Sequence, residues 1–155
     1  MTEKILIPLD GSPFGEGALK YVEQLIGNLE PASLPVITLL HVVPVPVRPA
    51  PVEGGVFNMS YDSPDREADK AAAVAYLEQA AESLRRTGAT VNCLTLIGEA
   101  GVSSAAGIIR AEAETGADLV AMSTHGRRGI TRLAFGSVTE KVLHGGNVPV
   151  RADKN

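Results

Sequence analysis

Short apolar runs alternate with helix-like segments along this chain, and that alternation limits its fold more than any other feature. We expect buried strands at residues 4–9, 36–43, 91–97, 118–122 and 148–150. The segments between them place apolar residues at helical spacing. Parallel strands need crossover connections, which are usually helices, and these helices bury both faces of the sheet. The sequence therefore predicts one α/β domain over residues 1–155, an open five-stranded parallel sheet with helices on both faces.

The expected helices begin at serine, with or without a following proline, and end at glycine. Serine can cap the first turn, proline loses no hydrogen bond at the first helical position, and glycine ends a helix readily. By these signals the helices run from Ser12-Pro13 to Gly27-Asn28, from Ser63-Pro64 to Gly88, from Ser103 or Ser104 to Gly116, and from near Ser137 to Gly145-Gly146.

Charge and composition exclude several classes of protein. The formal net charge of −4 argues against a general nucleic-acid binder, which would carry a basic face. The single cysteine rules out an internal disulfide framework. No apolar run approaches the roughly 20 residues of a membrane span, and the chain starts without a signal-like segment. We therefore expect a cytoplasmic protein that binds neither nucleic acid nor membrane.

A proline-rich region separates the second expected strand from the longest expected helix. Residues 44–63 contain prolines at positions 44, 46, 49 and 51 and a Gly54-Gly55 pair. A structureless connection of this length is uncommon inside a compact domain. We expect a loop here, which is a lid, a surface for a protein partner, or a mobile surface segment.

Candidate ligand-binding residues gather where the strands end. Ligands of open α/β sheets bind beyond the carboxyl ends of the strands, where the strand order reverses. The loops that converge there supply Pro8, Leu9 and Asp10 from the first strand, Val42 from the second, and Met122 onward from the fourth. Asp10 can accept hydrogen bonds from ribose hydroxyls or a base amino group, or it can cap a turn with Ser12. Val42 and Met122 can form apolar walls for a purine.

A glycine-bearing loop follows the fourth strand. Residues 123–129 read Ser-Thr-His-Gly-Arg-Arg-Gly, and Phe-Gly-Ser at 135–137 precedes the last expected helix. Backbone N–H groups in a strand–loop–helix arrangement bind phosphates, and the helix dipole favours anions. The N–H groups expected to do so lie around Gly126, Gly136, Ser137 and Val138, and the hydroxyls of Ser137 and Thr139 are further donors. Arg127 is either a solvated cation or a contact to a γ-phosphate.

The spacing of these glycines resembles a motif of the universal stress proteins. Nucleotide-binding members of that family carry a glycine, two residues, a second glycine, nine residues, and then glycine with serine or threonine. Gly126 matches the second glycine, and nine residues separate it from Gly136-Ser137. The ILIPLDGS sequence at residues 5–12, the LLHV sequence at 39–42 and the Gly98-Glu99 turn are also similar to the family. Neither a P-loop nor a GxGxxG sequence after the first strand is found.

The resemblance implies a Rossmann-like fold with strand order 3-2-1-4-5 and a homodimer. It also implies that ATP is bound, with Mg²⁺ as a further candidate. The positions that match the family's nucleotide site are Pro8, Leu9, Asp10, Val42, Met122, Ser123, Gly126, Gly136, Ser137 and Val138. Members act in stress resistance and signalling without a strong shared catalytic activity. Because no Ser-His-Asp set, metal-ligand spacing or catalytic carboxylate pair stands out, we expect at most a weak ATPase.

Two departures from the family pattern leave alternatives open. Ser123 occupies the place of the motif's first glycine, so we expect nucleotide binding to be weakened or unchanged rather than abolished. The last strand at 148–150 runs directly into charged residues, which discourages pairing across the family's dimer edge. The alternative function is a nucleotide-free interaction module whose working surface is the loop at 44–63.

Overall fold

The main sheet of the protein consists of five parallel strands. The computed structural model describes residues 2–13, 15–45, 47–60, 66–123 and 137–153. The strands of this sheet are β1 (Lys4–Pro8), β2 (Val36–Val43), β5 (Thr90–Ile97), β6 (Leu119–Ser123) and β7 (Val150–Asp153). Their spatial order is β5-β2-β1-β6-β7, and every pairing is parallel. Numbered by their place in the chain, these strands follow the order 3-2-1-4-5, which confirms the predicted fold.

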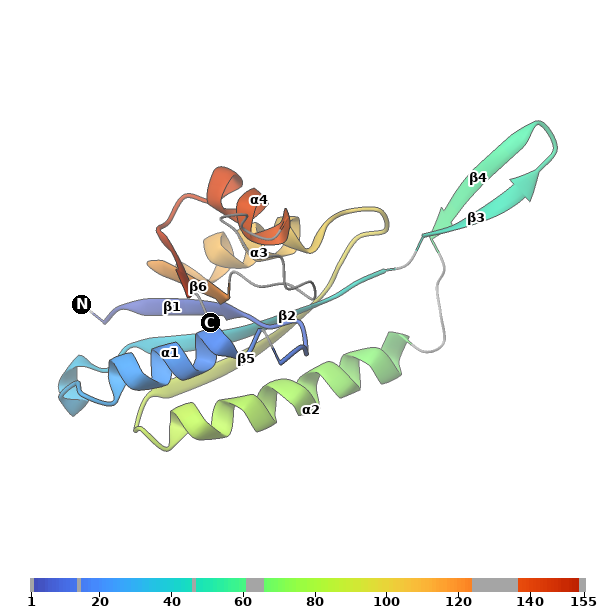
Figure 1. Cartoon of the computed structure of the whole chain (residues 1–155). Coiled ribbons are helices and arrows are strands. Elements are labelled where there is room, and N and C mark those ends of the chain that lie inside the picture. Colours follow the sequence, from blue (N-terminus) through green and yellow to red (C-terminus); the bar gives the residue numbers. More distant parts are fainter. Residues whose placement is uncertain (1, 14, 46, 61–65, 124–136, 154–155) are drawn as a thin grey trace.

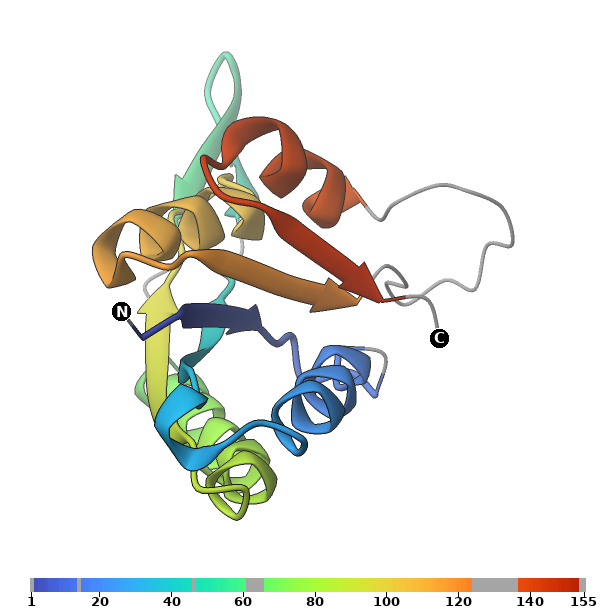
Figure 2. The same cartoon turned by 90° about the vertical axis from the view of Figure 1, so that its left-hand side faces the viewer.

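Two pairs of helices cover the two faces of this sheet. The helices are α1 (Gly17–Ile26), α2 (Arg66–Arg85), α3 (Ser104–Thr115) and α4 (Ser137–Gly145), with a short 3-10 turn at Pro31–Ser33. Helices α1 and α2 lie on one side of the sheet, and α3 and α4 lie on the other (Figure 2). None of the helices in the described part of the chain combines the length and the apolar character that crossing a membrane requires.

The core is split into two layers by the alternation of side chains along the strands. Ile5 and Ile7 of β1 pack in the layer under α1 and α2, with Leu77 of α2 among their neighbours. Leu6, between them in sequence, belongs to the opposite layer, where Val142 of α4 is also fully buried. A strand buried on both faces reads as a continuous apolar run, which explains why the strands could be recognised from the sequence.

The ends of the helices agree with the cap signals at some positions and differ at others. Helix α3 begins after Ser103 and ends at Thr115, and the next residue, Gly116, has a φ of 62°, the left-handed conformation expected of a C-terminal cap glycine. The prediction that Ser12-Pro13 opens the first helix is wrong, because α1 begins at Gly17. The Ser12 hydroxyl instead bonds within the turn that follows β1.

The proline-rich region is not the structureless loop that the sequence suggested. It contains a two-stranded antiparallel hairpin of β3 (Val47–Val52) and β4 (Gly55–Ser60), which forms a sheet of its own. Figure 1 shows this hairpin extending away from the body of the molecule, beyond the end of β2. Prolines are tolerated here because a two-stranded ribbon has only edge strands, where a missing N–H need not break a ladder.

The last strand also differs from its predicted position. Strand β7 covers Val150–Asp153 rather than residues 148–150, because β6 pairs along its length with Val150 through Asp153. The strand therefore includes two of the charged residues that were expected to follow it. It forms one edge of the main sheet, where charged side chains are common.

Candidate functional site

A cavity lies at the carboxyl edge of the sheet, at the point where the strand order reverses. The order changes direction between β1 and β6, and the cavity of about 280 Å³ opens beyond the ends of these strands. Its lining comes from β1, β2, β6, α3, α4 and the turn after β1. The lining residues are Pro8, Leu9, Asp10, Gly15, Leu40, Val42, Ser104, Ile108, Met122, Ser123, Ser137, Val138 and Thr139.

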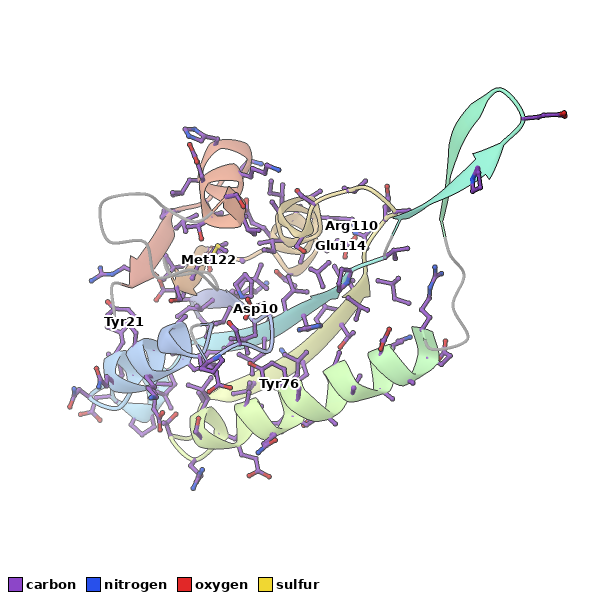
Figure 3. The ribbon with its side chains drawn as sticks, turned by 45° about the vertical axis from the view of Figure 1, so that its right-hand side comes forward. Asp10, Tyr21, Tyr76, Arg110, Glu114 and Met122 are labelled. Carbon is purple, nitrogen blue, oxygen red and sulfur yellow. The ribbon has the colours of Figure 1, made fainter. Side chains whose placement is uncertain are left out.

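Most residues predicted to form the site line this one cavity. Those that do so are Pro8, Leu9, Asp10, Val42, Met122, Ser123, Ser137, Val138 and Thr139. Figure 3 labels Asp10 and Met122, which reach the cavity from the ends of two adjacent strands. The remaining predicted residues, Gly126, Arg127 and Gly136, lie outside the described residues.

The carboxylate of Asp10 is held by the turn that follows β1. Its Oδ1 accepts hydrogen bonds from the Ser12 backbone N at 2.9 Å and from the Ser12 hydroxyl at 2.5 Å. The Ser12 hydroxyl in turn accepts a bond from the Gly15 N–H at 3.2 Å. Gly11 has φ of 79°, a conformation that residues with a Cβ rarely adopt, and this permits the tight turn. The turn contact predicted as the alternative for Asp10 is therefore present.

Val42 contributes an apolar wall, and a glycine of α3 allows the helix to approach it. A Cβ added at Gly107 would lie 3.0 Å from both Cγ atoms of Val42, which is too close for an unstrained contact. The absence of a side chain at Gly107 therefore lets α3 pack directly on the end of β2. This contact brings Ser104 and Ile108 of α3 to the cavity beside Val42.

The start of α4 provides the polar side of the cavity. Ser137, Val138 and Thr139 are the first residues of this helix, and the first N–H groups of an α-helix lack partners within it. The helix dipole gives this end a partial positive charge. Thr139 is buried, and its hydroxyl donates to the Ser123 carbonyl oxygen over 3.5 Å, so it ties α4 to the end of β6. This side of the cavity is suited to an anion.

His41 lies outside this cavity and has structural contacts. Its Nδ1 is 2.9 Å from the Leu9 carbonyl oxygen, and its ring meets that of Tyr76 edge-on, with 6.2 Å between the ring centroids. Burial, followed by the negative charges of Glu16 and Asp10, raises the pKa of Tyr76 to about 12. The Tyr76 phenol consequently stays protonated at neutral pH. These contacts connect β2, α2 and the turn after β1.

Four lining residues were not predicted from the sequence: Gly15, Leu40, Ser104 and Ile108. Ile108 and Ser104 lie one helical turn apart on α3, and no motif marks them as ligand-facing. Their position depends on the packing of α3 against β2. Gly15 could have been found, since a glycine soon after a strand often marks a close approach of the backbone to another group.

Acidic and metal-ligating side chains do not assemble into a metal site within the described ranges. No group of three or more His, Cys, Asp or Glu side chains is placed to hold an ion there. The described part of the cavity therefore offers an apolar wall, one carboxylate and a helix start. These features could bind a molecule that has a flat apolar part, a hydrogen-bond donor and an anionic end.

Comparisons with known proteins identify the family of this chain. Residues 1–152 match the sequence model of the universal stress protein family. This chain belongs to that family. A comparison with curated protein sequences gave no significant match.

Several solved structures of universal stress proteins and related chains have a similar fold. A hypothetical protein whose structure served to assign its biochemical function is 24% identical with a TM-score of 0.71, over 100% of this chain and 97% of that one. A universal stress protein in complex with cAMP is 18% identical with a TM-score of 0.67, over 98% and 97% of the two chains. One from Archaeoglobus fulgidus in complex with dAMP is 17% identical with a TM-score of 0.61, over 99% and 98%. At these identities the likeness establishes a common fold.

Proposed function

We propose that this universal stress protein binds ATP in the cavity at the carboxyl ends of β1 and β6. The observation that carries the proposal is the meeting of Asp10, Val42 and the start of α4 around one cavity. The nucleotide acts as a ligand or regulatory signal in a stress response or signalling pathway. Hydrolysis is slow or does not occur, so the protein is at most a weak ATPase.

Each part of ATP has a chemically suitable neighbour in this proposal. The adenine packs between Val42 and Met122, and a donor group of the nucleoside bonds to the Asp10 carboxylate. The phosphates extend toward the N–H groups that begin α4, where the helix dipole favours negative charge. By the family motif, Gly126 and Gly136 contribute to phosphate binding. Arg127, outside the motif positions, contacts the γ-phosphate in this proposal, and Mg²⁺ accompanies the phosphates.

Two relatives support an adenine nucleotide as the ligand class. One universal stress protein was solved with cAMP and another with dAMP, and both ligands contain adenine, a sugar and a phosphate. The cavity volume of about 280 Å³ in the described residues is close to the lower end, roughly 300 Å³, of small-molecule sites. Both observations are consistent with a nucleotide as the ligand.

Thermal unfolding tests this proposal directly. A ligand present at one hundred times its Kd stabilises the native state by about 2.7 kcal/mol. For a chain of this length, each kcal/mol raises Tm by roughly 2–4 °C, so saturating Mg-ATP should raise Tm by several degrees. No rise in Tm, together with no nucleotide released from denatured purified protein, would refute the proposal.

A matched pair of variants separates a site effect from a charge effect. Gly136→Asp adds a negative charge at the motif position expected to bind phosphate, and it should abolish the shift in Tm. Asn28→Asp adds the same charge to an exposed residue just after α1, outside the cavity lining. It should leave the shift unchanged.

A second candidate function rests on the β3–β4 hairpin. The hairpin forms its own sheet, separate from the main one, and extends from the body (Figure 1). An isolated two-stranded hairpin is only marginally stable in water, so contact with a partner would stabilise it. In this second candidate function the protein is a nucleotide-free interaction module that binds its partner through the hairpin. Replacing residues 47–60 by a Gly-Ser linker should then abolish partner capture, and Gly136→Asp should leave capture intact.

We also propose that the protein is a homodimer, as the family resemblance implies, and that it is cytoplasmic, as its sequence composition suggests. Pairing through β7 is disfavoured in this dimer, because the edge strand has four residues, two of them charged, and the Arg151 guanidinium lies 5.1 Å from the centroid of the Tyr21 ring of the same chain. Light scattering coupled to size-exclusion chromatography measures the mass in solution. A mass of one chain at every concentration tested would contradict the dimer.

A further inference from the structure

The turn after β1 contains a buried serine that contacts the edge of the cavity through one carboxylate. Ser12 is 8% exposed, although it lies in a turn at the protein surface between exposed neighbours. Its hydroxyl donates to Asp10 Oδ1 at 2.5 Å and accepts from the Gly15 N–H at 3.2 Å. Both hydrogen-bonding roles of the hydroxyl are therefore used inside the turn.

The two oxygens of the Asp10 carboxylate have different surroundings. Oδ1 accepts both bonds that Ser12 donates, one from its backbone N and one from its hydroxyl. For Oδ2, the described residues offer no hydrogen-bond donor. The Asp10 side chain is exposed and lines the cavity, as Figure 3 places it at the end of β1. The turn thus holds Oδ1, and none of its described residues donates to Oδ2.

Three features of the turn around Ser12 fix the position of the Asp10 carboxylate. Gly11 takes a φ of 79°, which brings the Ser12 N–H back toward Asp10. Gly15 lies so close to the carboxylate that an added Cβ would be 2.7 Å from Oδ1. The Ser12 hydroxyl joins the two, because it bonds to both Asp10 and Gly15. A side chain at Gly15 would displace the carboxylate, and the loss of the Ser12 hydroxyl would leave it held only by the Ser12 backbone N–H.

We propose that Ser12 is a positioning residue for nucleotide recognition, which fixes Asp10 Oδ1 so that Oδ2 accepts a hydrogen bond from the nucleoside. The inference rests on the proposed binding of ATP in this cavity. An ionised carboxylate only accepts hydrogen bonds, so the partner group on the ligand must be a donor. In ATP the candidate donors are the 2′-hydroxyl, the 3′-hydroxyl and the 6-amino group of adenine.

Binding measurements with four nucleotides test this role. Isothermal titration calorimetry gives Kd for ATP, 2′-deoxy-ATP, 3′-deoxy-ATP and inosine triphosphate, three of which each lack one candidate donor. Because a hydrogen bond to a charged group is stronger than a neutral one, the analogue without the bonded donor should bind wild-type protein about tenfold or more weakly than ATP. The analogue that loses affinity identifies the donor group.

Substitution of Ser12 should remove this discrimination. In Ser12→Ala, ATP should bind about tenfold more weakly, and its Kd should approach that of the discriminated analogue. Ser12→Thr keeps the hydroxyl and should restore much of the difference between the two nucleotides. Ser103→Ala is the matched control, because Ser103 precedes α3 without a side-chain cap hydrogen bond and lies outside the cavity lining. In an Asp10→Ala background, Ser12→Ala should cause no further loss.

The outcomes distinguish this inference from the proposed function. If wild-type protein binds none of the four nucleotides, the proposed function itself fails. If it binds all four equally, or if Ser12→Ala weakens all four by the same factor, ATP binding stands and the positioning role is refuted. Additive losses from Ser12→Ala and Asp10→Ala would also refute the role, since the serine would then act independently of the carboxylate.

Discussion

Replacing Gly15 with alanine should disturb Asp10 more than a methyl group added at any other glycine that the structure describes. The new Cβ would lie 2.7 Å from Asp10 Oδ1, whereas its next neighbours, the Ser12 carbonyl oxygen and the Asp10 backbone N, are at 3.5 and 3.6 Å. Oδ1 must therefore retreat by roughly half an ångström or more to reach an ordinary van der Waals separation. That movement breaks or lengthens the bonds from Ser12, which measure 2.5 and 2.9 Å.

The size of the effect follows from the bonds that are lost. Each hydrogen bond contributes about 0.5–1.5 kcal/mol, so the free energy of unfolding should fall by roughly 1–3 kcal/mol. At roughly 2–4 °C per kcal/mol, differential scanning calorimetry should record a Tm that is several degrees lower. Calorimetric titration should show ATP affinity reduced by about tenfold, because Asp10 Oδ2 no longer faces the nucleoside.

The control for this prediction is the same substitution in a protein that lacks the displaced carboxylate. In an Asp10→Ala background the close contact disappears, and Gly15→Ala should change neither Tm nor Kd appreciably. Equal losses from Gly15→Ala in the wild-type and Asp10→Ala backgrounds would show that the added methyl acts elsewhere. Unchanged Tm and Kd in the wild-type background would contradict the geometry of the turn.

Three further measurements test the packing, the backbone and the thiol. Leu77→Ala, at a fully buried position of α2, should lower the free energy of unfolding by about 2–5 kcal/mol, whereas Val74→Ala, 43% exposed in the same helix, should change it by under about 0.5. Gly116→Ala should destabilise by about 1 kcal/mol because φ is 62°, and Gly116→Asn by less. Burial, then Glu78, raises the pKa of Cys93 to about 11. Because only the thiolate form reacts with iodoacetamide, Cys93 should be labelled roughly 200-fold more slowly at pH 8 than an ordinary thiol. The labelling rate of Cys93 should then rise about tenfold per pH unit up to pH 10. Equal effects of Leu77→Ala and Val74→Ala, or of alanine and asparagine at position 116, would contradict the first two predictions. A labelling rate that levels off near pH 8.5 would contradict the third.

The sheet was predictable because its strands are short, continuous apolar runs. Strand β2 begins and ends where the apolar run between two prolines suggested, at Val36 and Val43. The hairpin was missed, although the Gly54-Gly55 pair is a recognised turn signal. Prolines at 49 and 51 argue against a strand in a large sheet, and the sequence does not reveal that these residues pair only with each other.

The candidate site was predictable where residues follow strand ends, and unpredictable where helix packing decides. Asp10 and Met122 follow or end apolar runs, so the topology alone places them at one edge. Ile108 lines the cavity because α3 packs closely on Val42. These two residues lie far apart in the sequence, so no local sequence pattern predicts that they meet. Ser12 was predicted to start a helix, but it closes a turn instead. A serine that caps a helix and one that closes a turn differ only in where the following backbone goes.

The placement of the hairpin in the crossover between β2 and α2 has a practical consequence. Neither the main sheet nor the described lining of its cavity includes residues of β3 or β4, and these two strands pair only with each other among the described strands. Evolution or a protein engineer can therefore lengthen, shorten or exchange this arm while the rest of the scaffold keeps its geometry. A peptide epitope grafted between Glu53 and Gly54 would be displayed at the tip of the arm, which extends away from the body of the molecule (Figure 1).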